Sequence, residues 1–183
     1  MIDAEHAGQL DPQSLAAQSV GVSVVDRGQL PLNVLLLNEC QMSHLPYDAT
    51  NDDISAFIDE WVTLLEAEDY DRAFAFTAHS AGSTLTPTSF RDHIKQQAAF
   101  HAQSFDETYG TLDPQCRVTL HGVPTHMTQV KDVDRWPKNT RGQVGEVWYN
   151  LNFDGFVTEY TALFEIVDDG SGLTIALLDI GVR

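Results

Sequence analysis

The sequence feature that most constrains the fold is an amphipathic stretch from Asp53 to Thr77. Within it, apolar residues recur at intervals of three and four, which places them along one side of an α-helix. This stripe consists of Ile54, Phe57, Ile58, Trp61, Val62, Leu64 and Leu65. The periodicity breaks at Glu68-Asp69 and resumes from Tyr70 to Phe76. We therefore expect a long helix, a break, and a short helix that returns toward the core.

Polar residues at the start of this stretch can begin the long helix. Asn51, Asp52 and Asp53 each carry a side-chain oxygen that can accept a hydrogen bond from the free N–H groups of a first helical turn. The sequence therefore offers an N-cap in any register of the helix.

A further helix is expected from Pro87 to about His101. Thr86 can serve as its N-cap, and Pro87 suits the first helical position because its missing N–H would be unpaired there anyway. Leu85 and Phe90 occupy the two positions of a hydrophobic staple. We expect residues 102–116 to form a loop, with turns at Tyr109-Gly110 and at Asp113-Pro114.

After Arg117 the pattern changes to one that predicts β-strands. The expected strands are 118–120, 126–133, 144–153, 157–167 and 173–182. A polar loop spans 134–142, and Asp154-Gly155 is a typical hairpin turn. A second hairpin loop covers 168–172, before a last strand that is almost entirely apolar and therefore central or well covered.

Alternation in the two longest strands divides their side chains between two faces of a sheet. One face carries Val147, Tyr149, Leu151, Phe153, Tyr160, Ala162, Phe164 and Ile166. The other carries Glu146, Trp148, Asn150, Asn152, Glu159, Thr161 and Glu165. Helices followed by antiparallel hairpins predict an α+β domain, with N-terminal helices packed on a curved, mainly antiparallel sheet.

The length of the chain and its pattern of apolar and polar residues divide it into two parts. A chain of 183 residues suits one domain, which we place at 51–183. Residues 1–50 differ from the rest in their pattern of apolar and polar residues. We expect them to form an extension that docks on this domain and ends in a loop at 38–48. The polar, acidic N-terminus lacks the basic start and apolar core of a signal peptide, so we expect a cytoplasmic protein.

The net charge of the chain limits the kinds of molecule that it is expected to bind. The chain has 27 acidic and 10 basic residues and a net charge of −17. This excess disfavours nucleic acids and anionic membranes, both of which need a cationic footprint on the protein. It favours a basic protein partner, although a salt-adapted host could produce the same bias. The cysteines, Cys40 and Cys116, are too few for a disulfide framework and are expected to be free or buried.

A Trp-bearing long helix and a short follow-on helix, FIDEWVTLLEAEDYDRAFAF, precede the strands. This order resembles the cystatin-like, NTF2-like architecture over about residues 52–183. The resemblance is one of layout and implies a pocket between helices and sheet, in which an acid of some members transfers protons. The tail YNLNFDGFVTEYTALFEIVDDGSGLTIALLDIGV also resembles, more weakly, the ends of small bacterial proteins of unknown function, some of them associated with toxin–immunity loci.

Several groups of residues are candidates for a metal or catalytic site, but each has a simpler structural interpretation. His121 and His126 are metal candidates, but no zinc-type ligand spacing surrounds them, so we favour no metal. Ser80, Ser83 and Ser89 lie near His79 and His93, yet the chain has no GxSxG elbow. The acids of the helix break, Glu66, Glu68, Asp69 and Asp71, suit a solvated corner better than a catalytic cleft. No phosphate-binding glycine motif occurs, and we expect no cofactor.

Three functions remain open. The leading hypothesis is a non-enzymatic protein-interaction domain, for example an immunity protein that neutralises a basic toxin, with Trp136 and Trp148 as anchors. The rival is a small-molecule pocket, binding or isomerase- or dehydratase-like, for which Glu146, Glu159 and Glu165 are the candidate acids. A third option is a structural module that forms homo-oligomers through a flat apolar sheet face.

Overall fold

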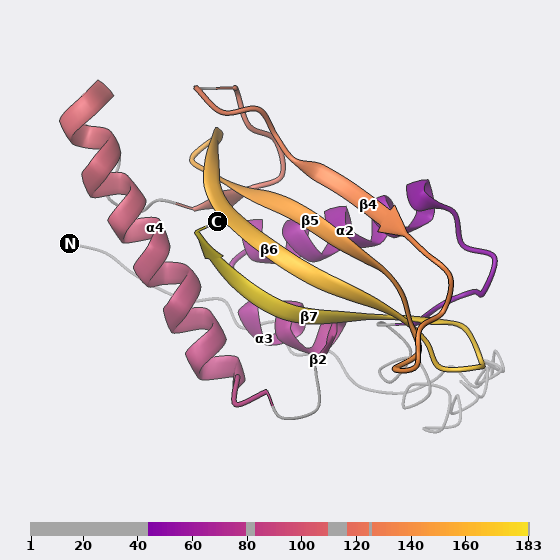
Figure 1. The fold of residues 1–183 in the computed structure, drawn as a ribbon. Coiled ribbons are helices and arrows are strands. Elements are labelled where there is room, and N and C mark those ends of the chain that lie inside the picture. Colours follow the sequence, from indigo (N-terminus) through magenta and orange to yellow (C-terminus); the bar gives the residue numbers. More distant parts are fainter. Residues whose placement is uncertain (1–43, 80–82, 110–116, 125, 183) are drawn as a thin grey trace, which may run out of the picture.

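The amphipathic stretch forms helices α2 (Asn51–Glu66) and α3 (Tyr70–Phe76), as the periodicity predicts. In this computed structural model the described residues are 44–79, 83–109, 117–124 and 126–182, without the side chains of 104–109. Most of the N-terminal extension, both cysteines and Ser80 lie outside these ranges. Three helices pack against a strongly curled sheet, which confirms the predicted α+β class (Figure 1).

Helix α2 begins one residue earlier than the N-cap candidates suggest. Thr50 is the N-cap: its side chain accepts a hydrogen bond from the N–H of Asp53, and the Asp53 carboxylate accepts one from the N–H of Thr50. This reciprocal capping box lowers the pKa of Asp53. The predicted break follows at Glu68, which adopts a positive φ of 57°. Asp69 then caps α3 by accepting from the N–H of Arg72.

Helix α4 (Pro87–Tyr109) is longer than the sequence pattern suggests. Thr86 caps it as expected, because its hydroxyl accepts a hydrogen bond from the N–H of Ser89. The expected end near His101 is wrong, because the helix continues to Tyr109; the rest of the stretch predicted to be a loop, 110–116, lies outside the described residues. Residues 102–109 carry no strong apolar stripe, but they include no helix breaker either, and the first glycine follows only after Tyr109.

The sheet is built around three long antiparallel strands, β5 (Gln143–Phe153), β6 (Phe156–Asp168) and β7 (Leu173–Val182). Short strands flank them: β1 (His44–Leu45), β2 (Ala78–His79), β3 (Val118–Thr119) and β4 (Lys131–Arg135). Strands β3 and β4 pair with β5, and β1 and β2 pair with β7. Among the named strands of the described residues, only β2 runs parallel to its neighbour, and the isolated bridge between Val123 and Phe156 is also parallel.

The hairpin turns were predictable, whereas two short strands were not. Asp154 and Gly155 have φ values of 48° and 78°, the paired positive angles of a two-residue hairpin. Strand β4 was expected at 126–133 but lies at Lys131–Arg135, so the following loop starts later than predicted. His44–Leu45 lies in the loop expected at 38–48, and no strand was expected at Ala78–His79, yet both pair with the free edge of β7. These two segments are too short to show an alternation of faces, and each lies in a stretch of polar or small residues, so the sequence pattern did not indicate a strand there.

The curl of the sheet comes from irregular pairing. The register between β5 and β6 shifts between Gln143 and Gly145 and again between Asn150 and Asn152. The register between β6 and β7 shifts between Leu163 and Phe164. Each irregularity bends its strand and increases the local twist, which lets the sheet wrap around the helices.

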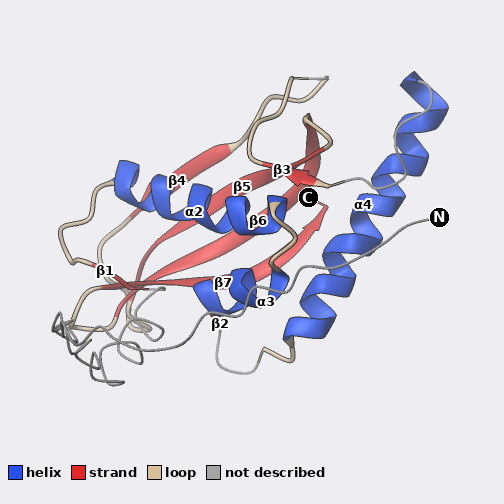
Figure 2. Cartoon of the chain, turned by 180° about the vertical axis from the view of Figure 1, so that it is seen from behind, coloured by secondary structure: helices blue, strands red, loops and turns tan. Residues whose placement is uncertain are grey.

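The helices α2 and α3 cover the inner, concave face of this sheet (Figure 2). Trp61 of α2 is fully buried, and its ring meets that of Phe164 edge-on at 5.0 Å between centroids. The indole N–H of Trp61 donates to the carbonyl of Ala73 at 3.1 Å, which fastens α2 to α3. The apolar face predicted for the long strands lines this core, including Val147, Tyr149, Ala162, Phe164 and Ile166.

Candidate interaction surface

The outer face of the sheet is the opposite side of the same strands and carries rows of carboxylates. Because side chains alternate along a strand, Glu146 and Glu165 point away from the face that buries Val147 and Ile166. Glu146 lies directly opposite Glu165 on β6 and directly opposite Asp134 on β4. One row therefore places three acids side by side across three strands.

A neighbouring row centres on an aromatic side chain. Trp148 lies opposite Asp132 on β4 and opposite Leu163 on β6, and Leu163 in turn lies opposite Asp179 on β7. The indole N–H of the half-buried Trp148 donates to the Glu146 carboxylate at 2.7 Å. Leu163 is buried, with 9% of the residue exposed, so the half-buried Trp148 is the apolar side chain that this row presents, and acids border it. We call the set Asp132, Asp134, Glu146, Trp148, Leu163 and Glu165 the outer acidic face.

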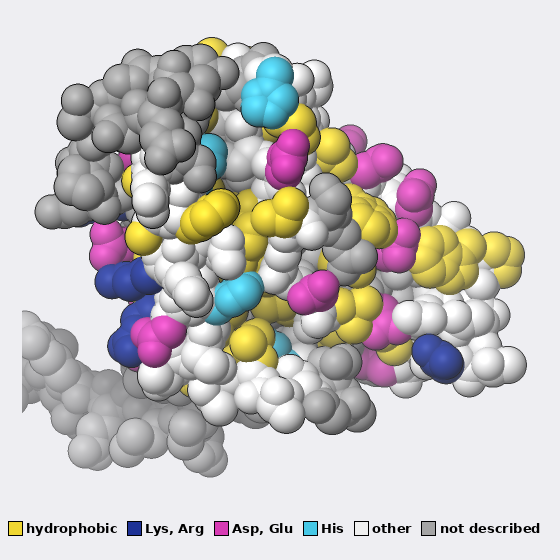
Figure 3. Space-filling model, turned by 60° about the vertical axis from the view of Figure 1, so that its left-hand side comes forward, with side chains coloured by type: hydrophobic (Ala, Val, Ile, Leu, Met, Phe, Trp, Pro, Cys, Tyr) yellow, Lys and Arg dark blue, Asp and Glu magenta, His cyan; other side chains and the backbone are white. Residues whose placement is uncertain are grey.

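No described helix lies over this face, which is turned toward the viewer in Figure 1. Figure 3 shows the molecule from the side of α4, with the sheet turned to the right. Acidic side chains gather there among apolar ones. The face therefore carries acidic and apolar side chains together, among other side chains.

Three of the described cations near this part of the sheet are engaged elsewhere. Lys131 pairs with Asp59 of α2, and Lys138 pairs with Asp168 at 3.1 Å. Arg135 donates to the carbonyl of Ala49. Among the described residues, no lysine or arginine forms an ion pair with Asp132, Asp134, Glu146 or Glu165. The negative charge of these four carboxylates is therefore available to a bound partner.

The remaining candidate acid and the candidate histidines lie toward one end of the sheet. Glu159 is 52% exposed and lies 4.0 Å from the imidazole of His126, which is 72% exposed. His121 is also exposed and is not brought to this pair. In the part of the chain that the structure describes, no group of three or more His, Cys, Asp or Glu side chains could hold a metal ion.

The candidate aromatic anchors differ in their setting. Trp148 lies within the outer acidic face, flanked by Asp132 and Leu163. Trp136 is half-buried just after β4, and its backbone N–H donates to the carbonyl of Val144. Trp148 is therefore the tryptophan that the structure brings together with the candidate acids.

The acids of the helix break have structural partners. Glu68 pairs with Arg117 at 3.0 Å and with Lys95 of α4 at 3.7 Å. Asp69 caps α3 and pairs with Arg72. Glu66 and Asp71 are exposed, so this corner joins segments of the fold rather than enclosing a cleft.

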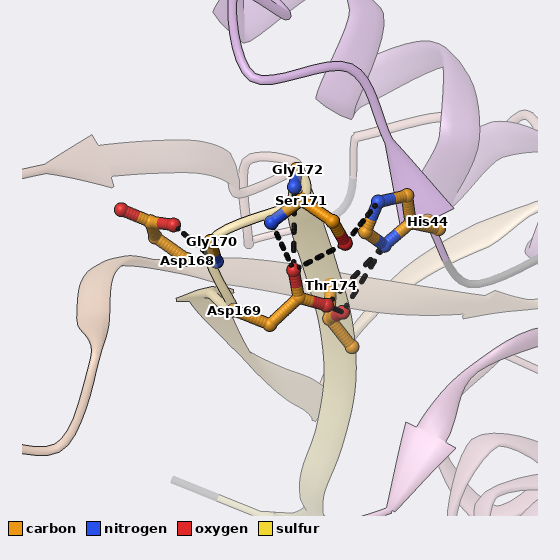
Figure 4. Close-up of polar contacts among 7 residues, drawn as sticks. All are labelled: His44, Asp168, Asp169, Gly170, Ser171, Gly172 and Thr174. Atoms are coloured by element: carbon orange, nitrogen blue, oxygen red, sulfur yellow. Dashed lines mark hydrogen bonds and ion pairs between the residues drawn. The ribbon is translucent and has the colours of Figure 1, made fainter.

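A second polar cluster fastens the β6–β7 hairpin to β1 (Figure 4). The Asp169 carboxylate accepts hydrogen bonds from the N–H and hydroxyl of Ser171, each at 2.8 Å, and from the hydroxyl of Thr174 at 3.0 Å. These bonds hold the pKa of Asp169 far below its usual range. His44 lies 3.5 Å from Asp169 and 3.4 Å from the Ser171 hydroxyl.

This Ser–His–Asp grouping has the geometry of a turn rather than of a nucleophile. In a catalytic triad the serine hydroxyl hydrogen-bonds to the histidine. Here the Ser171 hydroxyl donates to Asp169 at 2.8 Å and makes only a long contact of 3.4 Å with His44. The cluster therefore stabilises the hairpin and the docking of β1.

The interior between α2 and the sheet is filled by aromatic side chains. Trp61 contacts Phe164 and Phe90, and all three are at most 1% exposed. The candidate acids Glu146, Glu159 and Glu165 lie on the other face of the sheet. The pocket that the family resemblance implies would thus not contain them.

An open pocket does exist at the rim, between α4 and the end of β7, with a volume of about 700 Å³. Ser83, Ser89 and His93, residues of the discounted serine–histidine grouping, line it. The Ser89 hydroxyl donates to the carbonyl of Thr86 and so belongs to the helix cap. The sequence could not reveal this pocket, because its walls come from segments about ninety residues apart.

The described helices include none that is both long and apolar enough to cross a membrane. Comparisons of the chain with protein-family models, with curated proteins and with solved structures gave no significant match.

Proposed function

We propose that this chain is a non-enzymatic protein-interaction domain that presents its outer acidic face to a basic protein. One observation carries the proposal: Glu146 and Glu165 are direct cross-strand partners, and among described residues no cation neutralises them. Like charges directly opposite each other destabilise an antiparallel pair. A basic partner would relieve this repulsion, so the free protein carries a cost that binding removes.

The neighbouring row supplies the apolar part of such an interface. Binding energy concentrates in a few central residues, and tryptophan is prominent among them when polar groups surround it. Trp148 is held in place by its hydrogen bond to Glu146 and packs beside Leu163. A partner with lysine or arginine side chains around an apolar centre would complement this arrangement.

Neutralisation of a basic toxin by an immunity-type domain is one form of this function. The net charge of −17 would speed the approach of such a partner, with an association rate that falls as salt is added. A salt-adapted host would also favour an acidic chain, but it would not single out the sheet face. The two explanations therefore differ in whether the position of the acids matters.

A pull-down from cells of the native host, at low and at moderate salt, tests the proposal. Three baits are compared: the wild type, the face variant Glu146→Gln/Glu165→Gln, and the control Glu60→Gln/Glu66→Gln. The control removes two acids from α2 and leaves the net charge equal to that of the face variant. We expect a basic protein that the wild type and the control retain at low salt and that the face variant loses.

The purified partner is then titrated against the same three proteins. Binding that weakens with salt and depends on the face variant supports the proposal. If no partner is captured, if salt has no effect, or if both variants bind alike, the outer acidic face is not the interaction surface.

A further inference from the structure

The two edges of the sheet differ in how much of their backbone is covered. At the β7 edge, β1 and β2 pair with residues between Leu173 and Leu177. Farther along β7, the N–H of Ile180 donates to the Asp179 carboxylate, and the Ile180 carbonyl lies 3.0 Å from His93 Nε2. At the opposite edge, β4 pairs with β5 on one side, and no described strand pairs with its other side (Figure 1). Among the described residues, the β4 edge is therefore the more open of the two.

The hydrogen-bond register shows which backbone groups of β4 face this open edge. Val130 and Trp136, just before and just after β4, each form a backbone hydrogen bond to β5 at 2.9 Å. Bonded and non-bonded positions alternate in an antiparallel ladder, so the even-numbered residues of β4 face β5. The odd-numbered residues, Lys131, Val133 and Arg135, therefore turn their N–H and C=O groups toward the open edge.

These edge groups are accessible to another chain. Lys131 and Arg135 are exposed, and Val133 is half-buried. The Val133 carbonyl accepts a hydrogen bond from the side chain of Asn51 in α2 at 3.2 Å and keeps a second lone pair. Alternating N–H and C=O groups along an exposed edge are what an added strand pairs with in β-augmentation.

The side chains of β4 indicate what kind of strand would fit. Asp132 and Asp134 are exposed on the outer acidic face, and among the described residues neither pairs with a lysine or arginine. Lys131 and Arg135 point to the helix side, where each already has a partner in α2 or just before it. Because opposite charges directly across two strands stabilise the pair, the outward positions favour lysine or arginine.

The same pattern disfavours a second copy of this chain at the edge. An antiparallel pair of β4 strands centred on Val133 would place Asp132 opposite Asp134 and Lys131 opposite Arg135 of the other copy. Both combinations are like charges, which destabilise a cross-strand pair. Charged residues on an edge strand commonly prevent self-pairing in this way.

We propose that the basic partner adds a β-strand of its own to the edge of β4, with lysine or arginine opposite Asp132 and Asp134. This inference rests on the proposed function, because it names how the partner docks on the outer acidic face. The basic side chain opposite Asp134 continues the row that holds Glu146 and Glu165. Backbone hydrogen bonds supply affinity, and the alternating side chains supply specificity.

A short synthetic peptide in which lysine alternates with valine tests the inference on the full chain at low salt. One comparison peptide has the same composition with its lysines in a single block, and a second has glutamate in place of lysine. Hydrogen exchange followed by NMR reads each backbone amide of β4 separately. The indole signal of Trp148 reports on the outer acidic face.

We expect the alternating peptide to protect every second amide of β4. At about ten times its dissociation constant, it should slow the exchange of the Lys131, Val133 and Arg135 amides by about tenfold. The amides of Asp132 and Asp134 already bond to β5 and should change less. The block peptide should protect the three edge amides less strongly, and the glutamate peptide should not protect them.

Two pairs of variants separate the contribution of charge from that of the backbone. Asp132→Asn/Asp134→Asn should bind the alternating peptide about fivefold more weakly than the control of equal net charge, Glu60→Gln/Glu66→Gln. Lys131→Pro removes an N–H that faces the open edge, at the first residue of the strand, where proline is tolerated. It should bind about fivefold more weakly than Lys131→Ala, which loses the same side chain and keeps the N–H.

Three results would overturn the inference: no binding of the alternating peptide, equal protection by the block peptide, or equal affinity of Lys131→Pro and Lys131→Ala. A peptide that shifts the Trp148 indole and leaves the edge amides unprotected would show that the face binds through side chains alone. That result removes the added strand and leaves the proposed function standing. The pull-down with the Glu146→Gln/Glu165→Gln bait decides the proposed function separately.

Discussion

Glu146 of β5 and Glu165 of β6 lie directly opposite each other on the side of the sheet that no described helix covers. This pairing depends on an irregularity in the hairpin. A regular ladder continued from the pair Phe153–Phe156 would place Glu146 opposite Leu163. The register shift between Asn150 and Asn152 moves Glu165 there instead. The distortion that curls the sheet also brings the two acids together.

Replacing Trp61 with phenylalanine should destabilise the fold by about 2–3 kcal/mol. The change leaves a cavity in the core and removes the hydrogen-bond donor of the Ala73 carbonyl. Urea unfolding followed by circular dichroism measures the loss. Trp148→Phe on the outer acidic face is the control and should cost about 1 kcal/mol or less. Equal losses for the two variants would contradict the central position of Trp61.

Asp169→Asn should destabilise the fold at neutral pH, and this loss of stability should become smaller in acid. Because the pKa of Asp169 is lowered in the fold, its carboxylate contributes stability above the pKa of an unfolded aspartate, about 4. That contribution decreases progressively as the pH falls from this value toward the lowered pKa of the folded state. Urea unfolding at pH 7, 4 and 3 should therefore show a difference between wild type and variant that shrinks toward acid. A constant difference would show that the carboxylate has no special role in the turn.

Tyr149→Phe should make the protein less sensitive to alkali. Burial, reinforced by the charges of Asp59 and Glu66, raises the pKa of Tyr149 to about 12. A raised pKa favours the protonated form in the fold, so the stabilisation is complete below the unfolded value of about 10 and is lost as the pH rises toward 12.

The free energies of unfolding of wild type and Tyr149→Phe are therefore compared between pH 8 and pH 11.5. At pH 8 we expect a difference of about 1 kcal/mol or less, because the phenol makes only a long hydrogen bond, 3.4 Å, to Leu120. Above pH 10 the wild type should lose stability more steeply. Parallel curves would argue against a buried phenol at this position.

The local features of the fold could be predicted from the sequence. The stripe around Trp61 and the turn at Asp154-Gly155 each depend on neighbouring residues, and both formed as expected. The expected alternation of faces along β5 and β6 also placed Glu146, Trp148 and Glu165 on the face opposite the core. The end of α4 was missed because residues 102–109 contain neither a stripe nor a breaker.

Features that depend on distant segments could not be predicted in the same way. The opposition of Glu146 and Glu165 requires a register shift that no residue pattern announces. The pocket requires α4 to lie against β7, a contact that His93 and the Ile180 carbonyl make across 87 residues. Likewise, β1 and β2 pair with β7 through only two residues each.

The most direct test of the outer acidic face is the free energy of unfolding of Glu165→Gln in the isolated protein at low salt, with Glu60→Gln as the control for net charge. We predict that Glu165→Gln is about 0.2–1 kcal/mol more stable than the control, because it alone removes a cross-strand repulsion, and that added salt reduces the advantage. Equal stability of the two variants, or a less stable Glu165→Gln, would contradict the claim that this face holds charge that only a partner neutralises.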